Sequence, residues 1–155
     1  MRRTLIDHEF VEFVPSELKE GVLYISIPYT TSVHKCACGC GNKVVTPISP
    51  VDWQLLFDGD SVSLTPSIGN WEFPCRSHYW IKSDKIRWAG AWTPEEIAAG
   101  RQREARDHER YIAGRRVASN ATEQTDAETQ VENRPRRGLL ARILHWLGYY
   151  KVSHK

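Results

Sequence analysis

The chain has 155 residues, of which 41% are hydrophobic, and its formal net charge at pH 7 is only +2. This length suits one domain with additions, and the low net charge gives no reason to expect a nucleic-acid partner. No stretch approaches the roughly 20 apolar residues that span a bilayer, and MRRTLIDHEF does not resemble a signal peptide. We therefore expect a cytoplasmic protein, whose four cysteines favour metal binding or chemistry over disulfides.

Strand patterns dominate from about residue 22 to residue 90. VLYISIPY (22–29) alternates hydrophobic and polar residues, and KVVT (43–46) is a short strand before two prolines. Residues 52–66 predict a hairpin around Asp58-Gly59, and residues 78–90 predict another with its turn at Ser83-Asp84-Lys85. The predicted fold is mainly β, a small antiparallel sheet or barrel over residues 1–92.

A charged helix is predicted over residues 93–116. Thr93 is a suitable N-cap, Pro94 suits the first helical position, and Glu96 follows three residues after the cap. The dense charges of both signs that follow are typical of a solvated helix.

The last two segments differ in composition from the helix. Residues 117–133 are polar and lack periodicity, which predicts a disordered linker. Residues 134–155 contain basic residues and no acidic residue, with leucine and isoleucine at helical spacing. This pattern predicts a basic amphipathic tail helix that docks in a partner's groove, rests on an anionic membrane surface, or folds back onto the domain's own sheet.

Four cysteines form a candidate metal site. Cys36, Cys38 and Cys40 alternate within HKCACGCGN (34–42), and Cys75 follows 35 residues later. A structural zinc ion takes four ligands and accepts cysteine thiolates well, so we expect Zn²⁺ to staple a small sheet. Alternate side chains of a straight strand lie about 7 Å apart, so the cysteine segment must be looped or bulged.

Other interpretations of the cysteines remain open. In the first, the four cysteines are free thiols that pack as small hydrophobic side chains. In the second they bind an iron–sulfur cluster, and in the third Cys75 forms a disulfide with one of the other three. His34 or His78 would replace a thiol if only three cysteines bound metal, and an open coordination position would then permit hydrolytic zinc chemistry. Glu72 is the nearest candidate base for that chemistry.

A nucleophilic serine is a second hypothesis. Ser67 lies in a Pro-Ser-Ile-Gly turn to which His78 or His34 could return as a general base. Ser77 is adjacent to His78, but side chains of neighbouring strand residues point to opposite faces. Asn70 either donates to an oxyanion or caps the turn, and ordinary turn chemistry explains Ser67 and Asn70 equally well.

Two blocks, GVLYISIPYTTSVHKCACGCGNKVVTPISP and DGDSVSLTPSIGNWEFPCRSHYWI, resemble a bacterial family described as a domain of unknown function, over about residues 8–90. The motifs that carry the resemblance are CxCGCG and PCRSHYW. The resemblance implies a part in a bacterial ubiquitin-like conjugation pathway, with a ubiquitin-like protein and its activating and conjugating enzymes as partners. Its marked positions here are Cys36, Cys38, Cys40, Cys75, Ser77, His78 and the turn from Ser67 to Asn70.

The leading hypothesis is therefore a zinc-stapled serine-type peptidase or isopeptidase that processes or deconjugates a ubiquitin-like protein. Ser67 is the first choice for the nucleophile and Ser77 the second, with His78 as base and His34 in reserve. The alternative is a non-enzymatic adaptor that binds the ubiquitin-like protein or its conjugating enzyme.

Overall fold

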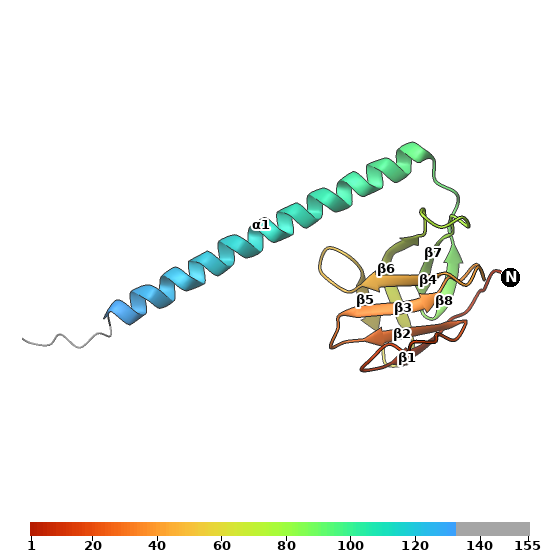
Figure 1. Ribbon diagram of the computed structural model, residues 1–155, viewed down its shortest axis with the longest axis horizontal. Helices are drawn as coiled ribbons and strands as arrows, with labels where there is room; N and C mark the ends of the chain where they lie inside the picture. The colour runs from red at the N-terminus through yellow and green to blue at the C-terminus, as the bar shows by residue number, and fades with distance from the viewer. Residues whose placement is uncertain (133–155) are drawn as a thin grey trace, which may run out of the picture. The chain divides into compact units, whose positions relative to one another are not determined.

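The computed structural model describes residues 1–132, which form eight strands followed by one helix (Figure 1). The elements are β1 (Asp7–Phe10), β2 (Val22–Ser26), β3 (Thr31–Lys35), β4 (Lys43–Pro47), β5 (Gln54–Phe57), β6 (Val62–Gly69), β7 (His78–Lys82), β8 (Lys85–Trp88) and α1 (Pro94–Glu132). The expected mainly β fold followed by a helix is confirmed. No helix among these residues is both long and apolar enough to cross a membrane.

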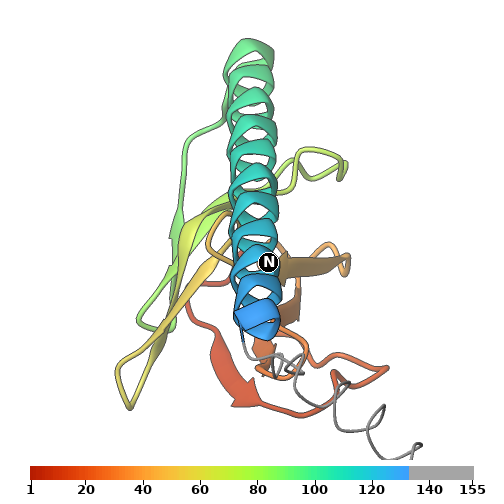
Figure 2. The same cartoon turned by 90° about the vertical axis from the view of Figure 1, so that its left-hand side faces the viewer.

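The strands form two sheets rather than one. Their orders are β1-β2-β3-β4 and β5-β6-β7-β8 (Figures 1 and 2). Residues of both sheets form one hydrophobic core. Leu23 and Ile25 of β2 are fully buried there with Leu64 of β6 and Tyr79 and Ile81 of β7. Burying one such aliphatic side chain contributes about 1.5–3 kcal/mol, so this shared core joins the two sheets.

Two strands were not predicted, and one pairing is parallel. β1 runs parallel to β2, whereas the other strand pairs within each sheet are antiparallel. β3, with the sequence TSVHK, contains a single aliphatic residue and so lacks a hydrophobic alternation. Its Ser32 is nevertheless fully buried, because its hydroxyl is hydrogen-bonded to that of Thr46 in β4.

Helix α1 begins as predicted but ends later. Thr93 and Glu96 form the expected capping box: Thr93 Oγ1 accepts from the Glu96 N–H at 3.3 Å, and the Thr93 N–H donates to Glu96 at 2.7 Å. The helix continues to Glu132 through most of the segment predicted to be disordered. No proline and no glycine occurs between Gly114 and Glu132, so nothing in the sequence ends the helix there.

The chain divides after Tyr111 into two compact units. The first unit, Met1–Tyr111, contains both sheets and the first turns of α1. The predicted tail helix, residues 134–155, lies outside the described residues.

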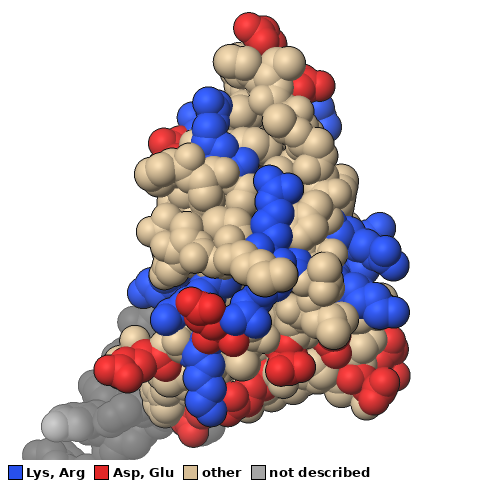
Figure 3. All heavy atoms as spheres, turned by 90° about the vertical axis from the view of Figure 1, so that its right-hand side faces the viewer, with Lys and Arg blue, Asp and Glu red and all other residues tan. Residues whose placement is uncertain are grey.

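On the face shown in Figure 3, Lys and Arg are interspersed with Asp and Glu, and the acidic side chains gather along its lower edge. The domain boundaries given above remain a prediction.

Candidate functional site

Strands β6 and β7 bring Ser67 and His78 together. Gly69 pairs with His78 and Ile68 pairs with Tyr79 in this antiparallel ladder. Because side chains alternate across a strand and Ile68 and Tyr79 point into the core, Ser67 and His78 share the opposite face. The Ser67 Oγ atom lies 2.9 Å from His78 Nε2, which is a hydrogen bond between a hydroxyl and an imidazole.

The local backbone of β6 explains why this diagonal pair can meet. The pairing with β7 shifts register between Leu64 and Ile68, so the segment that carries Ser67 departs from a regular ladder. Pro66 has no N–H, and the pairing of β5 with β6 ends at Thr65, directly before it. Gly69, directly opposite His78, has no Cβ, which leaves room for the ring of Trp71 that packs on the imidazole.

A backbone carbonyl holds the imidazole of His78 in one tautomer. His78 Nδ1 lies 3.3 Å from the carbonyl oxygen of Gly90, which can only accept a hydrogen bond. The proton is therefore on Nδ1, and Nε2 carries the lone pair that accepts the Ser67 hydroxyl proton. This tautomer is the one that a general base needs.

Three tryptophan rings surround His78. The ring centroids of Trp71 and Trp92 both lie 4.9 Å from that of the imidazole, and the centroid of Trp80 lies 5.5 Å away. Trp71 also stacks on Trp92, at 5.5 Å. These rings leave His78 only 4% exposed and give it few alternative positions. Their faces would also attract the imidazolium that forms when His78 takes a proton.

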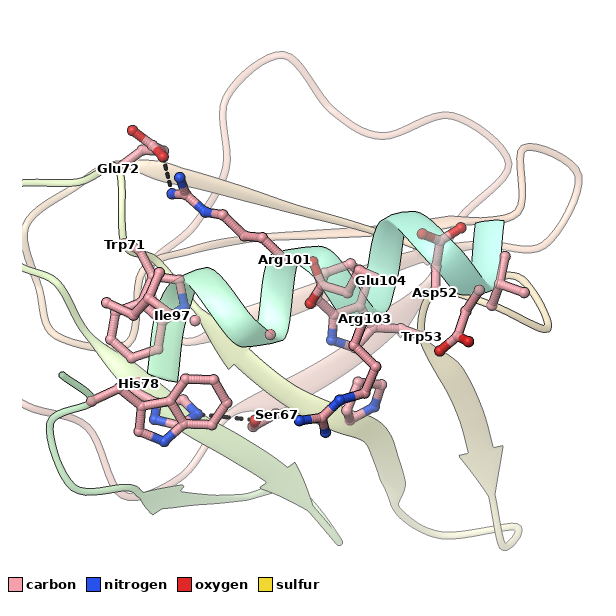
Figure 4. Close-up of a pocket in the computed structure, with 16 residues that line it drawn as sticks. Asp52, Trp53, Ser67, Trp71, Glu72, His78, Ile97, Arg101, Arg103 and Glu104 are labelled. Carbon is pink, nitrogen blue, oxygen red and sulfur yellow. Dashed lines mark hydrogen bonds and ion pairs between the residues drawn. The ribbon is translucent and has the colours of Figure 1, made fainter. Parts of the chain in front are cut away.

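Ser67 and His78 open onto a cavity of about 540 Å³ whose opposite wall is α1 (Figure 4). The sheet side and its loops contribute Asp52, Trp53, Ser67, Trp71, Glu72 and His78, and the helix contributes Ile97, Arg101, Arg103, Glu104 and Asp107. Two ion pairs hold the helix at this place. Arg101 contacts Glu72, and His108 Nε2 lies 2.9 Å from the Asp52 carboxylate.

The four cysteines converge, and they could hold a metal ion. Their Sγ atoms all lie within 4.8 Å of one another, although Cys75 comes from the loop after β6 and the other three from the loop between β3 and β4. Neighbouring sulfur atoms lie 3.3, 3.7 and 4.0 Å apart. A tetrahedral site with metal–sulfur bonds of 2.3 Å requires about 3.8 Å between sulfurs, so the cluster fits a four-thiolate site.

The cysteine loop is bent, as its spacing required. Gly39 and Gly41 have φ angles of 82° and 79°, in the left-handed region that side chains rarely adopt. A side chain at Gly39 would also collide with the backbone of Met1. These turns bring together thiols that a straight strand would hold apart.

Ser77 and Asn70 belong to the cysteine cluster rather than to the serine–histidine pair. Ser77 Oγ lies 3.0 Å from Cys36 Sγ and accepts a hydrogen bond from Asn70 Nδ2 at 2.9 Å. Burial raises the pKa of Cys75, but hydrogen bonds with Ser77, Cys38 and Cys40 together outweigh it and bring this pKa down to about 7. For Cys36, burial prevails and raises the pKa. Binding a metal would expel the remaining thiol protons.

The structure does not bring His34 to Ser67. His34 is fully buried in β3, its Nε2 lies 2.8 Å from the Tyr79 hydroxyl, and burial lowers its pKa to about 4. Its environment is therefore that of a core histidine. Glu72, considered above as a base beside the cysteines, is exposed and paired with Arg101.

Some residues of the site had no role in the sequence analysis. The carbonyl of Gly90 could not be found, because residue type does not report where a backbone oxygen points. The three tryptophans around His78 could not be assigned to the site either, because residue type does not separate a ring that packs on a base from a ring of the core. The wall contributed by α1 was also missed, because mixed charges on a helix are usually solvated.

Comparison with protein families gives a match that covers both candidate sites. Residues 10–89 match the model of the family described as "bacterial ubiquitination-like system serine protease (BubE)". This segment contains the four cysteines and the Ser67–His78 pair, and it ends before α1. Neither the curated proteins nor the solved structures gave a match.

Proposed function

The chain belongs to the BubE family of serine proteases of bacterial ubiquitination-like systems, and from this premise we propose that it processes or deconjugates a ubiquitin-like protein. Ser67 is the nucleophile and His78 the general base of this proposal. The observation that carries it is the 2.9 Å contact between Ser67 Oγ and His78 Nε2 at the edge of the cavity.

The geometry supports acyl transfer through a serine–histidine pair. Ser67 Oγ attacks the carbonyl carbon of the scissile bond while its proton passes to His78 Nε2. His78 then gives this proton to the departing amine, the carbon–nitrogen bond breaks, and an acyl-enzyme ester remains on Ser67. Water attacks the ester and passes a proton to His78, which returns it to Ser67 as the acid leaves. The Gly90 carbonyl keeps Nδ1 protonated throughout.

The cysteine cluster would hold Zn²⁺ in a structural role. Four thiolates fill a tetrahedral site and leave no position for water, so the metal supplies fixed geometry rather than a nucleophile. Cys75 and Ser77 are close to His78 in the sequence, so a metal there would fix the start of β7 beside the base. The reducing cytoplasm, where we place the protein, keeps such thiols free to bind.

The direct test is cleavage by purified protein. The ubiquitin-like protein, as precursor and as conjugate, is incubated with wild type, Ser67→Ala, His78→Ala and the control Ser16→Ala, which alters an exposed serine away from the site. Intact-mass spectrometry should show cleavage by wild type and Ser16→Ala, and a loss of at least about 1,000-fold in the other two. Cleavage that survives Ser67→Ala would remove Ser67 as the nucleophile.

The adaptor alternative has its own support in exposed aromatic surface. Phe13 and Tyr29 are 63% and 57% exposed, and their ring centroids lie 5.4 Å apart. A stable complex with the ubiquitin-like protein, without any mass change and unaffected by Ser67→Ala, would favour that role. Phe13→Ala should then weaken the complex.

A further inference from the structure

The tetrahedral intermediate on Ser67 needs a donor for its oxyanion, and the side chain that the sequence offered is already engaged. Asn70 is 8% exposed, and its Nδ2 donates to Ser77 Oγ at 2.9 Å and lies 3.7 Å from Cys36 Sγ. Turning this amide toward Ser67 would break contacts that support the cysteine cluster. Removing one oxyanion donor costs serine proteases about 100- to 1,000-fold in rate, so the donor must come from elsewhere.

The helical wall of the cavity supplies two arginines, and only one of them is engaged. Arg101 is held by Glu72. Arg103 also lines the cavity, and Figure 4 shows its side chain extending from α1 toward Ser67 and Trp53. Among the residues that the structure describes, no carboxylate forms an ion pair with Arg103. A guanidinium is permanently charged and carries five N–H donors.

Several contacts fix the part of α1 that carries Arg103. The capping box sets its start, Ile97 is 7% exposed against the sheet domain, and the ion pairs of Arg101 and His108 lie on either side of Arg103 in the sequence. Gly100 allows a close approach to Trp92, since a Cβ there would lie 3.2 Å from the ring. Arg103 is thus presented from a fixed helix rather than from a loose chain end.

We propose that Arg103 is a catalytic residue that donates hydrogen bonds to the oxyanion formed when Ser67 attacks, so that α1 completes the active site. This inference rests on the proposed function. It goes beyond the family match, which covers residues 10–89 and leaves the helix unassigned. The positive charge lies where negative charge develops, and it has no acidic partner that would have to be displaced.

A fluorophosphonate tests this role without a known substrate. Ser67 Oγ bonds to phosphorus, fluoride leaves, and the serine proton passes to His78, while the phosphoryl oxygen gains the charge that Arg103 would stabilise. Intact-mass spectrometry gives the labelling rate. We expect Arg103→Ala to slow labelling by about 100-fold, Arg103→Lys to retain part of the rate, and millimolar guanidinium to restore part of it for Arg103→Ala. Sodium chloride at the same ionic strength should not restore the labelling rate of Arg103→Ala.

The matched control is Arg106→Ala, three residues away on the same helix. Its exposed side chain bonds to the Gln102 carbonyl of the same helix and does not line the cavity, so this variant should label at the wild-type rate. In cleavage, Arg103→Ala should lower kcat with KM changed by less than about threefold. Equal labelling of wild type and Arg103→Ala, or equal slowing by Arg106→Ala, would overturn the role of Arg103 alone. Wild type that is not labelled at Ser67 would instead overturn the serine mechanism, and with it this inference.

Discussion

At the residue scale, neighbouring side chains of one segment serve two different sites. Ser77 points to the cysteine cluster and His78 to the cavity, because consecutive side chains point to opposite sides. The alternation rule therefore separated Ser77 from His78 correctly from sequence alone. The sequence analysis ranked His78 ahead of His34 as the base, and the structure adds a geometric reason: both histidines are buried, but His78 contacts Ser67 whereas His34 contacts Tyr79.

The role of Ser77 gives a prediction about metal affinity. Ser77→Ala removes the hydroxyl next to the sulfurs of Cys36 and Cys75, which stabilises thiolate. We expect metal affinity, measured by chelator competition, to fall by about 10- to 100-fold, as for other residues that support metal ligands. Metal-loaded protein should still cleave. Loss of cleavage at full metal content would instead give Ser77 a part in catalysis.

At the element scale, the hairpins and the helix start were predictable and two strands were not. Alternation and turn residues locate β5 to β8. The alternation marks a buried face in β6, β7 and β8, whereas β5 has no buried residue and its Phe57 is exposed. β1 pairs parallel to β2 through a long connection that no local turn signal announces. β3 buries the polar residues Ser32 and His34, so its sequence lacks the hydrophobic alternation by which a strand is predicted. The end of α1 was missed because polar composition was interpreted as disorder.

The β6 strand yields a prediction at Gly69. A Cβ there would lie 2.4 Å from Trp71 Nε1, so Gly69→Ala must displace the ring that packs on His78 and Trp92. We expect a loss of about 1–3 kcal/mol in the free energy of unfolding, as for other overpacked sites, and reduced labelling of Ser67. Thermal denaturation and the fluorophosphonate assay measure the two effects.

The control for that substitution is Gly114→Ala. No atom lies within 4 Å of a Cβ at Gly114, and alanine favours a helix by about 1 kcal/mol over glycine. This variant should be as stable as wild type or more so. If Gly69→Ala labelled as fast as Gly114→Ala, the position of the Trp71 ring would not matter for the base.

At the scale of the whole molecule, the cysteine cluster crosses between the sheets. Cys36, Cys38 and Cys40 lie in the loop that joins two strands of one sheet, and Cys75 lies in the loop that joins two strands of the other. A metal ion bound by all four thiolates would therefore tie the sheets together at one end of their shared core. The sequence predicted the ligand set, but the meeting of two separate sheets at the cluster appeared only in three dimensions.

Metal removal should consequently destabilise the fold as a whole. Treatment with a chelator is expected to lower Tm by more than about 10 °C, because losing a few kcal/mol shifts the Tm of a domain of this size by that much. Activity should fall with metal content, and added Zn²⁺ should restore both. An unchanged Tm after complete metal loss would mean that the thiols pack as small hydrophobic groups without a structural ion.

The tryptophans around His78 also allow the site to be followed by intrinsic fluorescence. Indole fluorescence is quenched by contact with a protonated imidazole, and Trp71 and Trp92 both contact this imidazole directly. Emission should therefore dim when His78 takes up a proton and change again when an acyl group occupies Ser67. Stopped-flow measurement of this emission could therefore follow proton transfer to His78 without an added label.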